Sequence, residues 1–311
     1  MEGRTGSEER PVAHLMSGSG PFVAAPGRPL SKNISDYPDG LVLVVDKPWR
    51  WTSADVIRKI KYAAIRHFGK KNLKVGHAGT LDPLADGVLL VCIGAATKKA
   101  EEYQRHDKEY LCELVFGATT PSYDLEKEPD AFFPTDGVTA ERVAAALEGF
   151  RGEQMQVAPL FSAKNIDGVR AYELARRAYK KGEKVDDGLL RASPVVISRL
   201  DLLDFGIFDG TLDSSSSEPA GSPDASRASS RIHVADVQAL AGHPAATLRI
   251  ACSKGTYIRA LARDIGETLG CGALISRLRR SASGDFTLRE ALTLDQALEL
   301  FHDSRRLTDA D

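Results

Sequence analysis

The chain has 311 residues, of which 42% are hydrophobic and 27% charged, a balance that indicates a folded globular protein and excludes a disordered or fibrous one. Its formal net charge of −2 excludes a protein that holds nucleic acid through bulk positive charge alone. No apolar run is long enough for a membrane helix and no leader pattern opens the chain, so we expect a cytoplasmic protein without membrane association.

The N-terminal third is expected to pass from an irregular extension into a folded domain. Residues 1–37 follow neither the helical nor the strand period and predict a flexible extension. The folded domain is expected to span residues 38–303 and to begin with a buried strand over 40–45. Ser53 is placed to cap a helix over 54–68, whose apolar residues form one stripe.

A run of basic residues covers the second half of this helix and the segment after it. No acidic residue interrupts the run before Leu81, and its members are Arg58, Lys59, Lys61, Arg66, Lys70, Lys71 and Lys74. Such a run is more often a solvated surface than a binding site. A local nucleic-acid surface is the alternative, and the run alone does not choose between the two.

Residues 76–87 are polar and rich in glycine, which predicts a loop before the apolar strand 88–93. Within the loop, Pro83 stiffens the turn directly behind Asp82 and so fixes where that carboxylate stands. Asp82 and Asp86 could form an acid/base pair of the glycosidase kind, but two carboxylates around a proline turn are more often turn-formers.

No metal or nucleotide cofactor is expected. His77 has no second His or Cys at metal-binding spacing, and the four cysteines form no CxxC pair. The glycines around His77 match neither the dinucleotide-binding nor the phosphate-loop pattern.

The rest of the chain alternates between strand and helix patterns. Strands are expected over 110–116, 195–205 and 247–253, and helices over 139–147, 170–179, 258–269 and from the Thr293 capping box to Phe301. Residues 164–184 carry seven basic residues against three acids, a second positive excess. Residues 208–230 hold eight serines and predict a disordered insertion, and residues 304–311 form a C-terminal tail.

Four segments, in this order, resemble the motifs of the TruB family of tRNA pseudouridine synthases. They are DKP at 46–48, GHAGTLDPLADGVL at 76–89, SKGTYIR at 253–259, and GCGA at 270–273 with LRR at 278–280. The resemblance extends over about residues 40–290. It implies an α+β fold, the pseudouridine-synthase catalytic fold, in which helices flank a central mixed, mainly antiparallel β-sheet.

The resemblance also implies a set of site residues and no cofactor or metal. Asp82 matches the nucleophile, Tyr110 matches the tyrosine that stacks on the target base and assists proton removal, and Arg259 matches the arginine paired with the aspartate. The remaining matches are expected to bind substrate or support its pocket: His77, Tyr257, Leu278, Asp124 and Lys47. A base inside an RNA stack must be flipped out before such groups can reach it.

The predicted activity is therefore isomerisation of uridine 55 in the T-loop of tRNA, with tRNA as the partner, no obligatory protein partner and a monomeric state. The residues after Arg280 are too few for the PUA domain that many members of the family carry, so we expect none. Two alternatives remain: a guide-RNA-dependent relative that modifies rRNA, which the expected lack of a PUA domain disfavours, and a non-catalytic RNA-folding protein.

Overall fold

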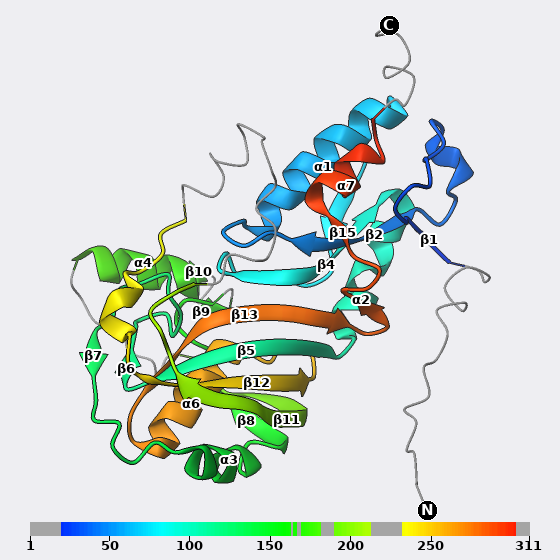
Figure 1. Cartoon of the computed structure of the whole chain (residues 1–311). Coiled ribbons are helices and arrows are strands. Elements are labelled where there is room, and N and C mark those ends of the chain that lie inside the picture. The colour runs from blue at the N-terminus through cyan, green and yellow to red at the C-terminus, as the bar shows by residue number, and fades with distance from the viewer. Residues whose placement is uncertain (1–19, 163, 167–168, 182–189, 213–231, 303–311) are drawn as a thin grey trace, which may run out of the picture.

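The computed structural model describes residues 20–162, 164–166, 169–181, 190–212 and 232–302 (Figure 1). They form an eleven-stranded mixed sheet, whose main path runs in the order β1-β2-β4-β13-β5-β12-β11-β8, with β3, β14 and β15 pairing beside it. The parallel pairs are β1 with β2, β13 with β4 and β15 with β2, and the other pairs of this sheet are antiparallel. The expected α+β class is confirmed.

The strands of this sheet are β1 (Phe22–Val23), β2 (Leu41–Lys47), β3 (Val75–His77), β4 (Ala85–Ile93), β5 (Lys108–Phe116), β8 (Gly152–Gln156), β11 (Ser193–Ile207), β12 (Pro244–Cys252), β13 (Ala273–Ser283), β14 (Phe286–Thr287) and β15 (Leu292–Thr293). Two small two-stranded sheets lie outside it, formed by β6 (Ala118–Thr119) with β7 (Ala131–Phe132) and by β9 (Asn165–Ile166) with β10 (Val169–Arg170).

The helices are α1 (Ser53–Phe68), α2 (Ala100–Arg105), α3 (Ala140–Glu148), α4 (Ala171–Lys181), α6 (Ile258–Leu269) and α7 (Leu294–Glu299), with short 3₁₀ turns η2 (Ile34–Asp36), η3 (Gly94–Lys99) and η5 (Val237–Leu240). Buried residues of α1, α3, α6 and α7 share one apolar core with one face of the sheet. The expected helices and long strands are therefore present, with ends shifted by a few residues.

Strand alternation divides the sheet residues between this core and the opposite face. On β5, Tyr110, Cys112 and Leu114 belong to the helix-covered core. Val115 points the other way, into a second cluster with Leu84 and Phe208. The helix-covered face is the one that carries the candidate catalytic residues described below.

The first helix begins with a cap that differs from the predicted one. Thr52 caps α1 and forms a capping box with Asp55. Ser53, which the sequence predicted as the cap, is instead buried and free to bond elsewhere in the fold. Thr52 and Ser53 are both good capping residues, and only the box partner at Asp55 separates them.

The predicted flexible extension over 1–37 is wrong for residues 20–37. Phe22 and Val23 form a strand that runs parallel to the start of β2, and Ala24 and Leu30 are buried. The Ser31 carbonyl lies 3.0 Å from Nε2 of His67 on α1. These short apolar pieces are ordered because they cover the edge of β2, and residues 1–19 lie outside the described part of the chain.

The predicted disordered insertion over 208–230 is wrong at its start. Phe208 is buried and packs with Leu212 and Ile232 against the sheet face opposite the helices. The serine-rich residues 213–231, like the tail 303–311, lie outside the described residues. Among the residues that are described, no helix has both the length and the apolar character needed to cross a membrane.

Candidate active site

Asp82 stands in the loop between β3 and β4, and this loop is held from two sides. On one side Ser53 donates from Oγ to the Leu81 carbonyl at 3.1 Å and accepts from the Leu81 backbone N–H at 3.0 Å. On the other side the buried Arg280 donates to the carbonyls of Val88 at 2.6 Å and Gly79 at 3.1 Å. Asp82 is thus fixed in place while its side chain stays 38% exposed.

Gly87 brings this loop close to β13. It adopts a φ of 98°, and a Cβ at this position would lie 2.2 Å from the Arg280 carbonyl oxygen. Only glycine allows β4 and β13 to approach this closely in this conformation. Their parallel pairing places Arg280 beside the loop that carries Asp82.

Arg259 projects from the first turn of α6 and faces Asp82. Its Nε donates to Asp82 Oδ2 at 2.9 Å, and its other nitrogens donate to the carbonyls of Ser122 at 3.2 Å and Phe161 at 2.8 Å. The guanidinium is buried, and Asp124 Oδ2 lies 3.6 Å from Nε. Burial works against the charge, but the two carboxylates outweigh it and raise the pKa of Arg259 above its usual value.

Asp124 completes this group from a tight turn after β6. Its Oδ1 accepts from Ser122 Oγ at 2.6 Å and from the Glu126 backbone N–H at 3.0 Å. The preceding residue, Tyr123, has a φ of 58°, a left-handed conformation that is uncommon outside glycine. Burial raises the pKa of Asp124, against the opposing effects of Arg259 and the Ser122 hydroxyl.

Two tyrosines flank the ion pair of Asp82 and Arg259. Tyr110 lies on β5, paired in register with Arg280 on β13, and is 9% exposed. Tyr257 directly precedes α6, two residues before Arg259. Burial raises the pKa of both phenols, and the negative charge of Asp82 acts in the same direction on each.

Leu278 and His77 lie on strands that border the Asp82 loop. Leu278 sits on β13 opposite Ala85, three residues after Asp82. His77 ends β3, and burial together with Arg280 lowers the pKa of its imidazole. The residues predicted from the resemblance therefore come from segments that meet around one ion pair.

Lys47 lies under the loop with its ammonium enclosed by protein. Its Nζ donates to the carbonyls of Pro48 at 2.9 Å, Trp51 and Pro83 at 3.4 Å. Burial lowers its pKa to about 7, although Asp86 and Asp82 act to raise it. This buried position fits support of the loop rather than contact with substrate.

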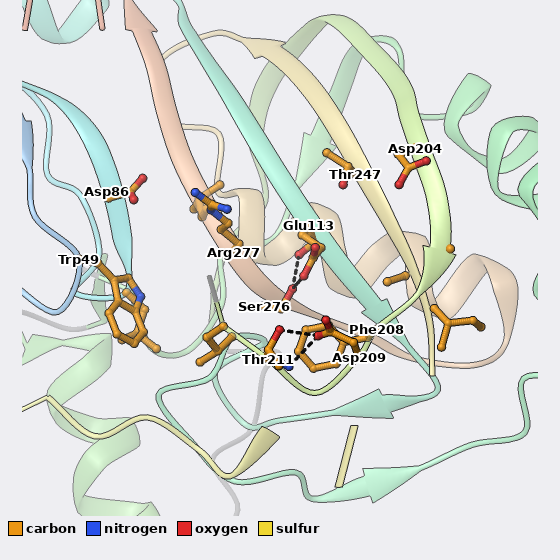
Figure 2. Close-up of a pocket in the computed structure, with 16 residues that line it drawn as sticks. Trp49, Asp86, Glu113, Asp204, Phe208, Asp209, Thr211, Thr247, Ser276 and Arg277 are labelled. Atoms are coloured by element: carbon orange, nitrogen blue, oxygen red, sulfur yellow. Dashed lines mark hydrogen bonds between the residues drawn. The ribbon is translucent and has the colours of Figure 1, made fainter. Parts of the chain in front are cut away.

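Asp86 does not form an acid/base pair with Asp82, nor a turn. It lies within β4, is buried, and contacts Arg279 Nη1 at 3.1 Å, while Arg279 Nη2 contacts Asp46 at 2.7 Å. Asp86 also lines a cavity of about 340 Å³ with Glu113, whose position on β5 faces away from Tyr110 (Figure 2). Asp82 is absent from that lining, so this cavity is not the candidate active site.

Several groups of the site were not predicted from the sequence. They are the side chain of Ser53 and the backbone carbonyls of Ser122 and Phe161, which anchor Asp82 or Arg259. Backbone carbonyls have no sequence signature, because every residue carries one. In the described part of the chain, no group of three His, Cys, Asp or Glu residues is placed to hold a metal ion.

Comparison with known proteins identifies relatives over most of the chain. The model of the TruB family pseudouridylate synthase N-terminal domain matches residues 66–218, and that of the tRNA pseudouridylate synthase B C-terminal domain matches residues 259–310. A tRNA pseudouridine synthase B of Phocaeicola vulgatus is 44% identical over 260 residues, which cover 84% of this chain and 92% of the relative. One from Bacteroides thetaiotaomicron is 45% identical over 257 residues, 83% of this chain and 91% of the relative.

Solved structures show the same fold at lower identity. The archaeal box H/ACA Nop10–Cbf5 complex matches with a TM-score of 0.52 and 22% identity, covering 89% of this chain and 57% of that one. A Cbf5–Nop10–Gar1 complex matches with a TM-score of 0.54 and 23% identity, covering 91% and 60%. The chain thus spans little more than half the length of these solved chains, and the likeness concerns the fold.

Proposed function

The chain belongs to the TruB family of pseudouridylate synthases, and we propose that it isomerises uridine 55 in the T-loop of tRNA to pseudouridine. The observation that carries the proposal is the ion pair between Asp82 and Arg259 at 2.9 Å, built on a loop that is fixed from both sides. A carboxylate held in this way is oriented before the substrate arrives.

The reaction exchanges one bond of the nucleoside for another. The bond from N1 of uracil to C1′ of ribose breaks, the base rotates, and a bond from C5 to the same carbon forms. The proton on C5 leaves and N1 gains one, so no atom is added and nothing is oxidised. The proposed reaction therefore needs no cofactor or metal.

Asp82 serves as the nucleophile in this proposal because it is the exposed carboxylate of the site. The Arg259 guanidinium fixes which oxygen of Asp82 faces outward, since Oδ2 accepts a hydrogen bond from Nε. Binding of RNA removes water from the pocket and strengthens this interaction. Arg259 itself is held by the carbonyls of Ser122 and Phe161, so the pair resists displacement.

The remaining groups are assigned to the flipped base. Tyr110 offers an aromatic face for stacking and, as a phenol with a raised pKa, stays protonated until a partner takes its proton. Tyr257, Leu278 and His77 are assigned to substrate binding, as the family resemblance implies. Asp124 orients Arg259, and Lys47 supports the loop from below.

We further propose that the protein acts on tRNA in the cytoplasm as a monomer, without an obligatory protein partner. The basic residues of α1 and of the segment up to Lys74 supply a local positive surface for the RNA backbone. The outer side of α1 bears the exposed Arg58, Lys61 and Arg66. Because the net charge of the chain is −2, attraction to RNA phosphates has to come from a local cluster of positive charge such as this one.

The test is incubation of the purified protein alone with an unmodified tRNA transcript, followed by mapping of pseudouridine. Modification confined to position 55 without added RNA supports the proposal. A requirement for a guide RNA would instead support the rRNA-modifying alternative. Binding and refolding of tRNA without any pseudouridine would identify a non-catalytic RNA-folding protein.

A further inference from the structure

Gln156 forms hydrogen bonds to the backbone just before α6 through both ends of its side-chain amide. Its Oε1 accepts from the Tyr257 N–H at 2.8 Å, and its Nε2 donates to the Tyr257 carbonyl at 3.1 Å. The side chain thus pairs with one residue's backbone much as a neighbouring strand would. Gln156 is 3% exposed, so its side-chain amide is largely shielded from bulk water.

The position of Gln156 in the sheet makes this contact possible. Gln156 is the last residue of β8, the strand at the end of the sheet path, and within the described residues it pairs on one side, with Ser193 of β11. Figure 1 shows β8 beside β11 at the edge of the sheet, with α6 nearby. From the end of this strand, its side chain reaches Tyr257, the residue just before α6.

The backbone position of Tyr257 determines where the side chains of Tyr257 and Arg259 lie. It is the N-cap residue of α6, and its side chain makes no capping bond. The helix start is therefore secured from outside, by Gln156. Tyr257 is one of the residues assigned to the substrate site, and Arg259 follows two residues later, so a shift of this backbone moves both side chains relative to Asp82.

The segment after Gln156 continues along the same helix. The Val157 carbonyl accepts from Arg263 Nη2 at 3.0 Å, and the Phe161 carbonyl accepts from Arg259 Nη2 at 2.8 Å. Residues 156–161 therefore contact α6 at Arg259, in its first turn, and at Arg263, one turn later. The contact of Gln156 with α6 is made by its side chain, so it can be changed without altering the backbone.

We propose that Gln156 is a positioning residue for the isomerisation. Its amide fixes the backbone of Tyr257 and thereby sets the distance and direction of Arg259 toward Asp82. This inference rests on the proposed function, because it concerns the rate of the same reaction. An amide is required since one end must accept and the other must donate.

Two variants test the proposal against a matched control. Gln156→Glu keeps the size and shape of the side chain but replaces the donor to the Tyr257 carbonyl with a carboxylate oxygen. Gln156→Met removes both bonds without burying a charge, and serves if the first variant fails to fold. Gln154→Glu makes the same change two residues earlier on β8, where the side chain donates to Phe150 and not to α6.

The experiment measures single-turnover pseudouridine formation with enzyme in excess, alongside tRNA affinity and the circular dichroism spectrum. Both variants at position 156 should lose about 10- to 100-fold in rate, the range expected when a catalytic group is displaced by about 1 Å. Their affinity for tRNA should change by less than about twofold, and the control should keep the rate of the unaltered protein.

The pH dependence separates positioning from a general loss of stability. A protonated carboxyl at position 156 can donate through its O–H and accept through its carbonyl, as the amide does. The rate of Gln156→Glu, relative to unaltered protein, should therefore recover as the pH is lowered, whereas that of Gln156→Met should not. Burial raises the pKa of such a carboxyl, which brings this recovery into a range where the protein stays folded.

The results distinguish the inference from the function on which it rests. If the unaltered protein forms pseudouridine and both folded variants at position 156 keep its rate, the inference is overturned and the proposed function stands. A loss of tRNA affinity that accounts for the whole loss of rate would also overturn it. If the unaltered protein forms no pseudouridine, the proposed function fails first and the inference with it.

Discussion

Replacing Arg259 with methionine should both stop catalysis and weaken the fold. Its side chain connects the Asp82 loop to the turn at Ser122 and Asp124 and to the carbonyl of Phe161. Methionine has a similar length and fills the buried space, but it carries no charge and no donor. The carbonyls of Ser122 and Phe161 lose their partner, and Asp124 loses the guanidinium 3.6 Å away. Asp82 is more exposed and can turn toward water.

The size of the effect follows from the burial of each partner. Removing one member of a buried ion pair costs about 3–5 kcal/mol, since the other charge is left uncompensated. A buried carbonyl without a partner costs about 1–3 kcal/mol, and the exposed pair with Asp82 contributes at most about 1 kcal/mol. These costs overlap, so we expect Arg259→Met to lower the free energy of unfolding by about 3–5 kcal/mol near neutral pH.

The loss should shrink as the pH falls. Without Arg259, the pKa of buried Asp124 rises further above its value in the unfolded chain, so the folded state binds a proton that the unfolded state does not. Between these two pKa values the stability of the variant therefore increases as the pH is lowered. A smaller rise is expected in Arg259→Met/Asp124→Asn, which has no carboxyl at this position.

Urea unfolding followed by circular dichroism measures the effect at several pH values. Single-turnover assays on folded protein measure the accompanying loss of pseudouridine formation. A loss of stability below about 1 kcal/mol near neutral pH, the range of an exposed ion pair, would show that Arg259 is not a buried partner of Asp124. So would a deficit that does not depend on pH.

Three further perturbations test other parts of the structure. The pKa of Lys47 is about 7 in the folded protein, against an ordinary value of 10.5. Between these two pH values the unfolded state binds more protons than the folded state, so Lys47 makes the free energy of unfolding rise with pH. Lys47→Met should flatten that rise in urea titrations. Charge reversal of Lys70, Lys71 and Lys74 should weaken tRNA binding and reduce the slope of log affinity against log salt by about 0.7–0.9 for each lost phosphate contact, and an unchanged slope would make this surface merely solvated. Gly87→Ala should lower the free energy of unfolding by at least about 1–3 kcal/mol, because its Cβ would meet the backbone of β13, and an unaltered melting temperature would contradict this.

The parts of the fold that could be predicted are those in which local pattern and tertiary packing agree. The apolar run of β4 and the amphipathic stripe of α6, closed by Gly270, are found close to where the sequence places them. The loop position of Asp82 was also predicted, because the glycines and Pro83 around it indicate a turn that fixes where its carboxylate stands. Its pairing with Arg259, 177 residues away, followed only from the family resemblance.

The failures have physical causes that single-sequence patterns do not contain. Asp86 sits between Pro83 and Gly87, which favours a turn, yet it extends β4 because Arg279 on the neighbouring strand compensates its charge. Phe22 and Val23 are too few to show a strand period, and they are ordered only because β2 offers an edge. Gln156 looks like any surface glutamine until the fold places Tyr257 beside it.

Asp82→Asn tests whether the Asp82 carboxylate is the nucleophile. The amide keeps the size of the side chain but is far less nucleophilic, and Asp86→Asn is the control for a carboxylate that serves structure only. In single-turnover assays with excess enzyme and tRNA transcript, we expect Asp82→Asn to lose several orders of magnitude in rate while fold and tRNA affinity are preserved. Folded Asp86→Asn should retain pseudouridine formation. Appreciable turnover by folded Asp82→Asn protein would rule out Asp82 as the nucleophile.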